Sequence, residues 1–317
     1  MVENYPRTLD EFEARFADEA ACRDYLIGLR WSEGLVCPRC QSKQMWSTGR
    51  GLLACSTCQY QASVTAGTIF HDTRKPLQMW FRAIWWVTSQ KTGASALGLQ
   101  RVLGLGSYKT AWTWLHKLRR AMIRPGRERL SGRVEVDETY LGGSEDGVHG
   151  RQTERKALVV VAVEEKTGKR MGRIRMRRVK NASASSLHPF VRECVEPGSV
   201  VHTDGWEGYS GLGKKGYMHQ VTVLAARAES ASELLPRVHR VVSLLKRWLG
   251  GTHQGAVSPE HLDYYLDEFT FRFNRRTSRY RGKLFYRLLQ NAVATDPTPY
   301  RTMVKHARGR KPQNHNI

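Results

Sequence analysis

Between residues 131 and 180 the chain alternates apolar and polar positions with the period of two that β-strands show. In the first part of this region Val134 and Val136 fall on one face, and Glu135 and Asp137 fall on the other. A mostly apolar run, a Lys-Thr-Gly-Lys turn and a second alternating run follow. The pattern predicts three consecutive strands, at 132–140, 156–164 and 172–179.

The next segments change from helical to strand character and back. We predict a short helix at 183–195, strands at 199–203 and 220–224, and a long helix at 232–249. The order is three strands, a helix, two strands and a helix, which is an α/β order with an antiparallel start. This order predicts an RNase H-like core, a mixed sheet with flanking helices.

The N-terminal third has helical patterns instead. Thr8 and Glu11 form the two ends of a capping box, and Phe12 and Phe16 lie one helical turn apart. Pro76 stands at a position typical of a helix start, before an aromatic-rich segment that extends to residue 90.

Two further helices, at 93–103 and 107–122, are separated by a Gly-Leu-Gly turn, and Ser107 is the expected N-cap. This spacing is typical of a helix-turn-helix, in which the second helix enters the DNA major groove. An ordinary αα-hairpin is the alternative. The basic residues predicted to contact DNA from the second helix are Lys109, Lys117, Arg119 and Arg120.

Four of the six cysteines form two CxxC pairs that 14 residues separate: Cys37, Cys40, Cys55 and Cys58. Each CxxC turn points two thiolates at one tetrahedral centre, so two turns complete a closed structural Zn²⁺ site of the zinc-ribbon type. Disulfides are the competing interpretation, which an intracellular location disfavours. The remaining two, Cys22 and Cys194, are expected to be ordinary buried thiols.

Charge indicates the class of partner. The 317 residues contain 51 Lys and Arg against 29 Asp and Glu, a formal net charge of +22. Hydrophobic residues make up 40% of the chain, which argues against a disordered basic protein. A folded chain with this charge favours a polyanionic partner, and we expect double-stranded DNA.

The positive charge is concentrated in two blocks. Residues 169–180 hold seven bases and no acid, and residues 271–317 hold twelve bases against Asp296 alone. Single-sign blocks favour phosphate-facing surfaces, so Arg175 and Arg177 join the predicted DNA contacts.

Hydropathy and the first residues indicate the compartment. The mean hydropathy is −0.51, and no apolar run approaches the ~18 residues of a membrane span. The first residues are acidic and lack the apolar stretch of a signal peptide. We therefore expect no membrane partner and a cytoplasmic, nucleoid-associated protein.

Two aspartates are the candidate catalytic groups. Asp137 lies along the first predicted strand of the core, and Asp204 follows the fourth. These strands are neighbours in an RNase H-like sheet, so the carboxylates would converge and bind divalent metal between them. Such a pair supports two-metal phosphoryl transfer. Ordinary capping or turn aspartates are the alternative.

Several ordered motifs resemble the transposases of the insertion sequence 1595 family (ISXO2-like). They are VEVDETYLGG, VVHTDGWEGY, SLLKRWLGGTHQG and SPEHLDYYLDEFTFRFNRR. The resemblance implies a DDE-type transposase that cuts and joins DNA with Mg²⁺ or Mn²⁺. By motif position Asp137 and Asp204 match the first two catalytic acids of the family.

The third catalytic position departs from the common pattern. Aligned on SLLKR, His239 takes the place of the usual glutamate, with 34 residues between it and Asp204. Imidazole ligates Mg²⁺ poorly and prefers Mn²⁺. Glu229 and Glu233 are nearby acids that could take the role instead. Lys246 lies two turns further along the same predicted face, and the resemblance implies that it holds a DNA phosphate.

Together these features predict the function and the division of the chain. We expect an insertion-sequence transposase that cleaves transposon ends and joins the 3′-OH to target DNA, as a homodimer or larger assembly at two synapsed terminal inverted repeats. A non-catalytic zinc-ribbon DNA-binding protein is the alternative. The expected parts are an N-terminal helical segment (1–30), the zinc ribbon (31–72), the helix-turn-helix-like segment (73–125), the catalytic domain (131–291) and a basic tail (292–317).

Overall fold

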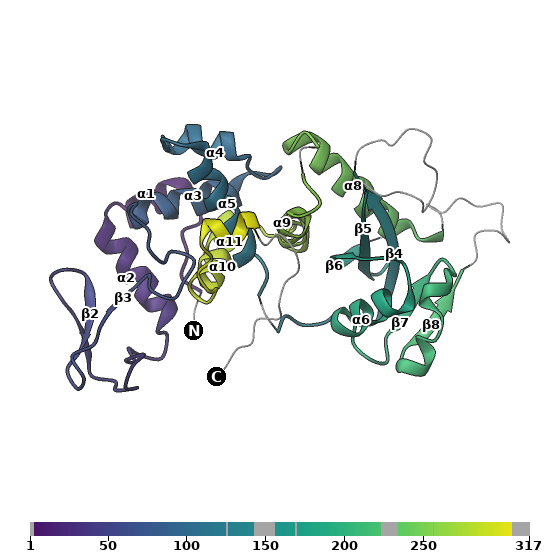
Figure 1. Cartoon of the computed structure of the whole chain (residues 1–317), viewed down its shortest axis with the longest axis horizontal. Helices are drawn as coiled ribbons and strands as arrows, with labels where there is room; N and C mark the ends of the chain where they lie inside the picture. The colour runs from purple at the N-terminus through teal and green to yellow at the C-terminus, as the bar shows by residue number, and fades with distance from the viewer. Residues whose placement is uncertain are drawn as a thin grey trace. The chain divides into compact units, whose positions relative to one another are not determined.

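The chain forms two compact units, drawn in Figure 1. The computed structural model describes residues 3–124, 126–142, 156–168, 170–222, 234–255 and 257–305. One unit combines Met1–Arg124 with Thr277–Ile317, and the other is Pro125–Arg276. The sequence pattern extended the catalytic domain to residue 291, whereas the structure groups the residues after Arg276 with the N-terminal unit.

The first unit is a helical body that carries a small antiparallel sheet. The sheet has the order β1-β2-β3 and consists of β1 (Met45–Ser47), β2 (Leu52–Cys55) and β3 (Gln61–Ser63). The helices are α1 (Leu9–Arg15), α2 (Glu19–Arg30), α3 (Leu77–Ser89), α4 (Ala96–Leu103), α5 (Tyr108–Ala121), α10 (Arg281–Val293) and α11 (Tyr300–Lys305).

An aromatic cluster explains why α10 returns to this unit. Phe285 of α10 is fully buried, and its ring centroid lies 5.4 Å from that of Phe12 and 5.7 Å from that of Phe81. Gly282, three residues earlier in α10, lets the segment before α1 pack closely against this helix. A Cβ at this position would lie 1.5 Å from the carbonyl oxygen of Pro6. Burial of these rings stabilises the joining of two segments far apart in sequence.

The second unit is built on a five-stranded mixed sheet in the order β6-β5-β4-β7-β8. Its strands are β4 (Arg133–Leu141), β5 (Ala157–Glu165), β6 (Met171–Val179), β7 (Val200–Thr203) and β8 (Met218–Val221). β4 pairs antiparallel with β5, and β5 with β6, while β7 runs parallel to β4 and β8. The predicted mixed sheet of an RNase H-like core is confirmed.

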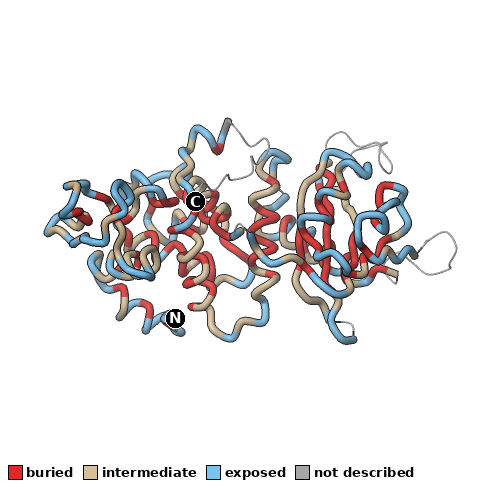
Figure 2. The backbone as a smooth tube through the Cα atoms, turned by 90° about the horizontal axis from the view of Figure 1, so that it is seen from below, coloured by how far each residue is buried: buried red, intermediate tan, exposed pale blue. Residues whose placement is uncertain are grey.

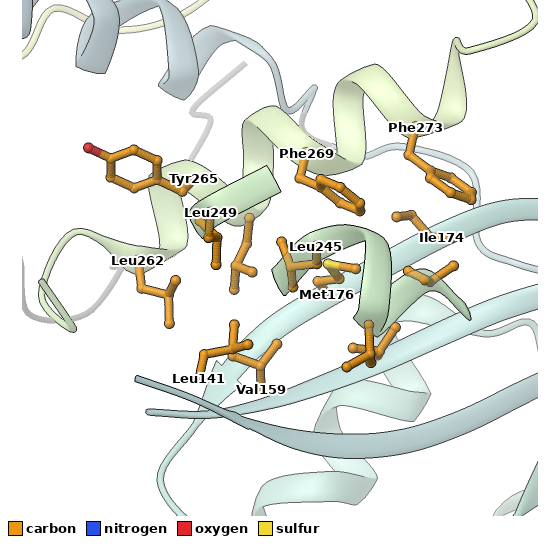
Figure 3. Close-up of a cluster of buried hydrophobic side chains, with 14 of the residues drawn as sticks. Leu141, Val159, Ile174, Met176, Leu245, Leu249, Leu262, Tyr265, Phe269 and Phe273 are labelled. Carbon is orange, nitrogen blue, oxygen red and sulfur yellow. The ribbon is translucent and has the colours of Figure 1, made fainter. Parts of the chain in front are cut away.

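Helices cover both faces of this sheet. They are α6 (Ala184–Cys194), α8 (Pro236–Thr252) and α9 (Leu262–Asn274), and short 3₁₀ turns lie at Glu207–Tyr209 and Gly213–Lys215. On one face Leu245 and Leu249 of α8 pack over Leu141 and Val159, as Figure 3 shows. On the other face α6 packs over Val134 and its neighbours.

Because both faces are covered, buried residues run along the strands of this unit (Figure 2). The strand β5 is buried over all but its last residue, as its apolar run predicted.

Among the described residues, no helix combines the length and the apolar character needed to cross a membrane.

One buried carboxylate ties α8 to the sheet. The sequence pattern placed Glu135 on an outward polar face, but its side chain is only 1% exposed. It accepts hydrogen bonds from the backbone N–H of Arg237 (2.8 Å) and of Val238 (2.9 Å) in the first turn of α8. The guanidinium of Arg237 donates a further bond of 2.9 Å to the same carboxylate. Glu135 thus acts as the missing N-cap of a helix that starts at Pro236.

Removal of this carboxylate is expected to destabilise the second unit. Glu135→Ala leaves two helix N–H groups without their acceptor, at about 1–3 kcal/mol each. The Arg237 guanidinium loses one of its two carboxylate partners and keeps Glu165 at 3.1 Å. Urea unfolding followed by circular dichroism measures the change in the free energy of unfolding.

The matched control is Glu193→Ala, which also removes a carboxylate paired with an arginine. Glu193 pairs with Arg177, but its side chain is 62% exposed, so the expected cost is about 0–1 kcal/mol. Equal destabilisation by the two substitutions would contradict the anchoring role of Glu135.

Candidate functional site

The pairing of β4 with β7 brings the two predicted catalytic aspartates to one place. In this parallel pair Val134 lies opposite Val201, and Glu135 lies opposite His202. The same register carried two residues further puts Asp137 level with Asp204, just past the end of β7. Adjacent strands lie about 4.8 Å apart, so the two carboxylates lie side by side. We call this place, where β7 ends beside the middle of β4, the carboxylate edge.

Local hydrogen bonds orient each carboxylate. Asp137 Oδ1 accepts a hydrogen bond of 2.8 Å from the backbone N–H of Glu138. Asp204 Oδ1 accepts one of 3.0 Å from the backbone N–H of Trp206, which closes a tight turn after the strand. These bonds fix the position of each carboxylate on the backbone.

His239 comes from α8 to the same edge. It lies in the first turns of that helix, and its Nε2 is 3.8 Å from Asp137 Oδ2. Burial lowers the pKa of His239, and the charge of Lys246 adds to this effect, while the carboxylates of Glu135 and Asp204 oppose it. The ring is thus kept neutral near pH 7, in the form that can ligate a metal.

Two further residues of this edge were missed from the sequence. Glu138 is one of them, and its Oε2 accepts a hydrogen bond of 2.7 Å from the hydroxyl of the buried Tyr209, the other. Burial raises the pKa of Tyr209 well above 10, and the charges of Glu138, Asp137 and Asp204 raise it further. Tyr209 therefore stays protonated as a donor behind the aspartates. Its position five residues after Asp204, in the same motif, is the signal that could have revealed it.

Lys246 is exposed on α8, on the side that carries His239. The alternative acids Glu229 and Glu233 lie outside the described residues, as does Lys169 of the first basic block. The basic tail is described only to residue 305.

The four cysteines of the zinc ribbon form the second candidate centre. Their sulfur atoms all lie within 4.8 Å of one another, and the Cys37–Cys58 and Cys40–Cys55 pairs are each 3.6 Å apart. Tetrahedral Zn²⁺ with Zn–S bonds of about 2.3 Å requires S···S distances of about 3.8 Å. The residues fit a structural zinc ion. In the described ranges this is the one group of three or more such ligands so closely spaced.

The ribbon moves the pKa values of its thiols in opposite directions. Backbone N–H groups, that of Cys58 first, lower the pKa of Cys55 to about 6. Although the N–H of Ser42 lowers it, the pKa of Cys40 rises to about 12, because the nearby sulfurs of Cys58 and Cys55 outweigh that effect. Four sulfurs this close cannot all ionise without a cation among them, which zinc supplies.

The two helices predicted at 93–103 and 107–122 are present, as α4 and α5, with their predicted turn and cap. Gly104 ends α4 in the left-handed conformation (φ 61°), and Ser107 caps α5, with its Oγ accepting a bond of 3.3 Å from the N–H of Thr110. Lys109 is exposed, with its Nζ 4.2 Å from the ring centroid of Tyr300. Lys117 and Arg120 are half-buried on the same helix.

Two predicted DNA contacts are inside the protein instead. Arg119 is 2% exposed and lies 3.5 Å from His116 Nε2. Arg175 is 5% exposed and donates to the backbone carbonyls of Ile174 and Glu128. Both residues thus support the fold and not a phosphate-facing surface. From the same basic block, Arg177 is half-buried and pairs with Glu193.

One zinc ion per chain is expected by metal analysis of the purified protein. With zinc bound, alkylation should spare the ribbon thiols, and a chelator should expose all four. Cys22 and Cys194 should react only in denaturant, because burial raises the pKa of these thiols to about 12 and about 11. Six thiols that react at one rate in the zinc-loaded protein would contradict this assignment.

Comparison with known proteins agrees with the two sites. Residues 129–274 match the ISXO2-like transposase domain, and residues 17–61 match the transposase zinc-ribbon domain, both of the IS1595 family. An uncharacterized protein in transposable element ISH50 of Halobacterium salinarum is 26% identical over 289 residues, 84% of this chain and 94% of that protein.

Among solved structures, one chain of the simian T-cell lymphotropic virus intasome in complex with PP2A regulatory subunit B56 gamma has a TM-score of 0.32 at 15% identity. The aligned region covers 59% of this chain and 70% of that chain. A TM-score this low supports no conclusion about fold or function. The chain thus contains an ISXO2-like transposase domain and a transposase zinc ribbon, both of the IS1595 family.

Proposed function

We propose that this chain is the transposase of an insertion sequence, which cleaves the transposon ends and joins the freed 3′-OH to target DNA. The observation that carries the proposal is the level placement of Asp137 and Asp204 on neighbouring strands, with His239 3.8 Å from Asp137. These groups lie within the transposase domain of the family.

Asp137 and Asp204 would hold the divalent ions, because the β4–β7 register puts the two aspartates level with each other and Mg²⁺ and Mn²⁺ prefer carboxylate oxygens as ligands. When bound, Mg²⁺ or Mn²⁺ activates the attacking oxygen and stabilises the leaving 3′-oxygen. His239 would complete the ligand set through a neutral imidazole. Glu135 is a positioning residue, because it holds the first turn of α8 against the sheet.

The DNA partner would be held by basic residues of both units. From α5 the candidates are Lys109, Lys117 and Arg120, and from the second unit they are Arg177 and Lys246. The helix-turn-helix would recognise the terminal inverted repeats, with the zinc ribbon docked beside the same ends. Synapsis of two ends requires a homodimer or larger assembly, working on the DNA of the nucleoid.

A non-catalytic DNA-binding protein is the second candidate function. The observation that favours it is histidine in place of the family's usual third acid, since imidazole is a poor ligand for Mg²⁺. The intact aspartate pair favours the enzyme, because a protein that only binds DNA does not need two carboxylates at one sheet edge.

Strand transfer on a duplex oligonucleotide that carries the terminal repeat separates the two functions. Asp137→Asn is expected to reduce the rate by roughly 10³-fold or more, the scale on which loss of a charge-stabilising group is felt. The control, Glu193→Gln, changes an exposed acid of the same unit and should leave the rate unchanged. An inactive wild-type protein that still binds the ends would favour the second candidate.

His239→Ala tests the third position. We expect strand transfer to be lost while binding to the ends is retained, since His239 faces Asp137 and its removal leaves the exposed Lys246 in place. The wild type should be more active in Mn²⁺ than in Mg²⁺, because nitrogen ligands suit Mn²⁺ better, and His239→Glu should reverse this order. A fully active His239→Ala protein would rule out the proposed role.

Lys246 is expected to contribute one phosphate contact. Lys246→Ala should reduce the slope of log affinity against log salt by about 0.9, the value for one phosphate contact on duplex DNA. Lys214→Ala is the matched control, since Lys214 is an equally exposed lysine in a 3₁₀ turn of the same unit. Identical salt slopes for the two variants would contradict a specific role for Lys246.

A further inference from the structure

A large cavity lies beside the carboxylate edge in the second unit. It has a volume of about 1010 Å³ and opens where β4 ends and β5 begins. Residues of the β4 end, the β6 end, the α6 start and the turn after Asp204 line it. Neither catalytic aspartate is among the lining residues, so the cavity is a neighbour of the carboxylate pair and not a part of it.

Trp206 is held at the wall of this cavity by three independent features. Its indole Nε1 donates a hydrogen bond of 2.7 Å to the carbonyl oxygen of Ala182, and its backbone N–H donates to Asp204. Gly208 leaves room for this arrangement, because a Cβ there would lie 2.1 Å from the Ala182 oxygen and 2.8 Å from the indole nitrogen. Yet 37% of Trp206 is exposed. A large aromatic ring fixed in place and left open is the form of a stacking platform.

The charges around the cavity select an anionic ligand. Lys156, Arg178 and Lys180 line it, and Glu207 is the one acid among its lining residues, which gives a formal balance of 3 − 1 = +2. Asp263 does not line the cavity, but its Oδ2 lies 3.7 Å from Nε of Arg178 and partly neutralises the charge of that guanidinium. Lys180 is exposed and Lys156 is half-buried. Cations beside an aromatic wall suit a ligand that joins a phosphate to a flat ring.

We propose that this cavity binds an unstacked nucleotide of the DNA strand beside the scissile phosphodiester, with its base on Trp206 and its phosphate near Lys156 and Lys180. The inference rests on the proposed function, because Asp204 lies two residues from Trp206 and ties the cavity to the reacting phosphate. A base inside a duplex has both faces covered by its neighbours, so it can use this platform only after it leaves the stack.

Photocrosslinking tests the location without any need for catalysis. Full-length protein is bound to end-bearing duplexes in which 5-iodouracil replaces one thymine at a time around the cleavage site. We expect one position to crosslink to Trp206, identified by mass spectrometry of the peptides. Met218 of β8 is the matched control, because it is also exposed (59%), belongs to the same unit and lies outside the cavity.

Activity then tests the stacking itself. Trp206→Ala should reduce cleavage of the ends by about 5- to 150-fold, the range measured for loss of one base–aromatic stack. Trp206→Phe should restore most of the rate, and Met218→Ala should leave it unchanged. An abasic site at the crosslinked position should slow the wild type to a similar extent but have no further effect on Trp206→Ala.

The outcomes separate the two proposals. Suppose that the wild type cleaves the ends. The nucleotide subsite is then wrong, and the transposase function stands, if the abasic site slows the wild type and Trp206→Ala equally or if no position crosslinks to Trp206. If Trp206 crosslinks and neither Mg²⁺ nor Mn²⁺ supports cleavage, the subsite stands and the enzymatic function is wrong.

Discussion

The buried carboxylate of Glu135 is the interaction on which the geometry of the second unit depends. A charge with 1% exposure would cost several kcal/mol to bury alone, but three hydrogen bonds and the positive end of α8 offset this cost. The same bonds fix where α8 begins, at Pro236, and therefore how its following turns face the sheet. His239 reaches Asp137 because the helix cannot slide away from Glu135.

The sheet supplies the other half of the arrangement through its one switch from antiparallel to parallel pairing, at β4. β4 has an antiparallel partner on one side and a parallel partner on the other. The parallel partner β7 ends beside the middle of β4, so Asp204 at its end meets Asp137 along the length of its neighbour. If β7 ran antiparallel to β4, the first residues of β7 would lie beside Asp137 instead of its last ones. Asp204, which follows the end of β7, would then lie at the far end of the strand.

Much of this arrangement follows from local sequence, and what does not follow has a common physical cause. The CxxC spacing, the strand order and the Ser107 cap are local, and the structure has all three. Local sequence does not determine whether a charged side chain faces solvent or the interior of the protein. Arg119 and Arg175 carry the charge of DNA contacts, but each is buried where the surrounding fold supplies partners.

The helix α10 shows the same limit at a larger scale. Its aromatic residue Phe285 meets Phe12, 273 residues earlier in the chain, and no periodicity within 281–293 indicates that partner. The position of His239 could be found only through the family's motif order, since the helix pattern alone leaves several polar residues of α8 equivalent.

The two candidate centres differ in how far the protein prepares them. The ribbon sulfurs already stand at the spacing of a tetrahedral zinc site, so zinc binding and folding are one process there. At the sheet edge, hydrogen bonds from Glu138 and Trp206 fix each aspartate, but the aspartates and His239 are not gathered into a cluster as close as that of the cysteines. The surroundings of this edge are held by hydrogen bonds within the protein, those of Glu135 to α8 and that of Tyr209 to Glu138. An open edge of this kind leaves space for a phosphate between the ligands, which a closed site would not.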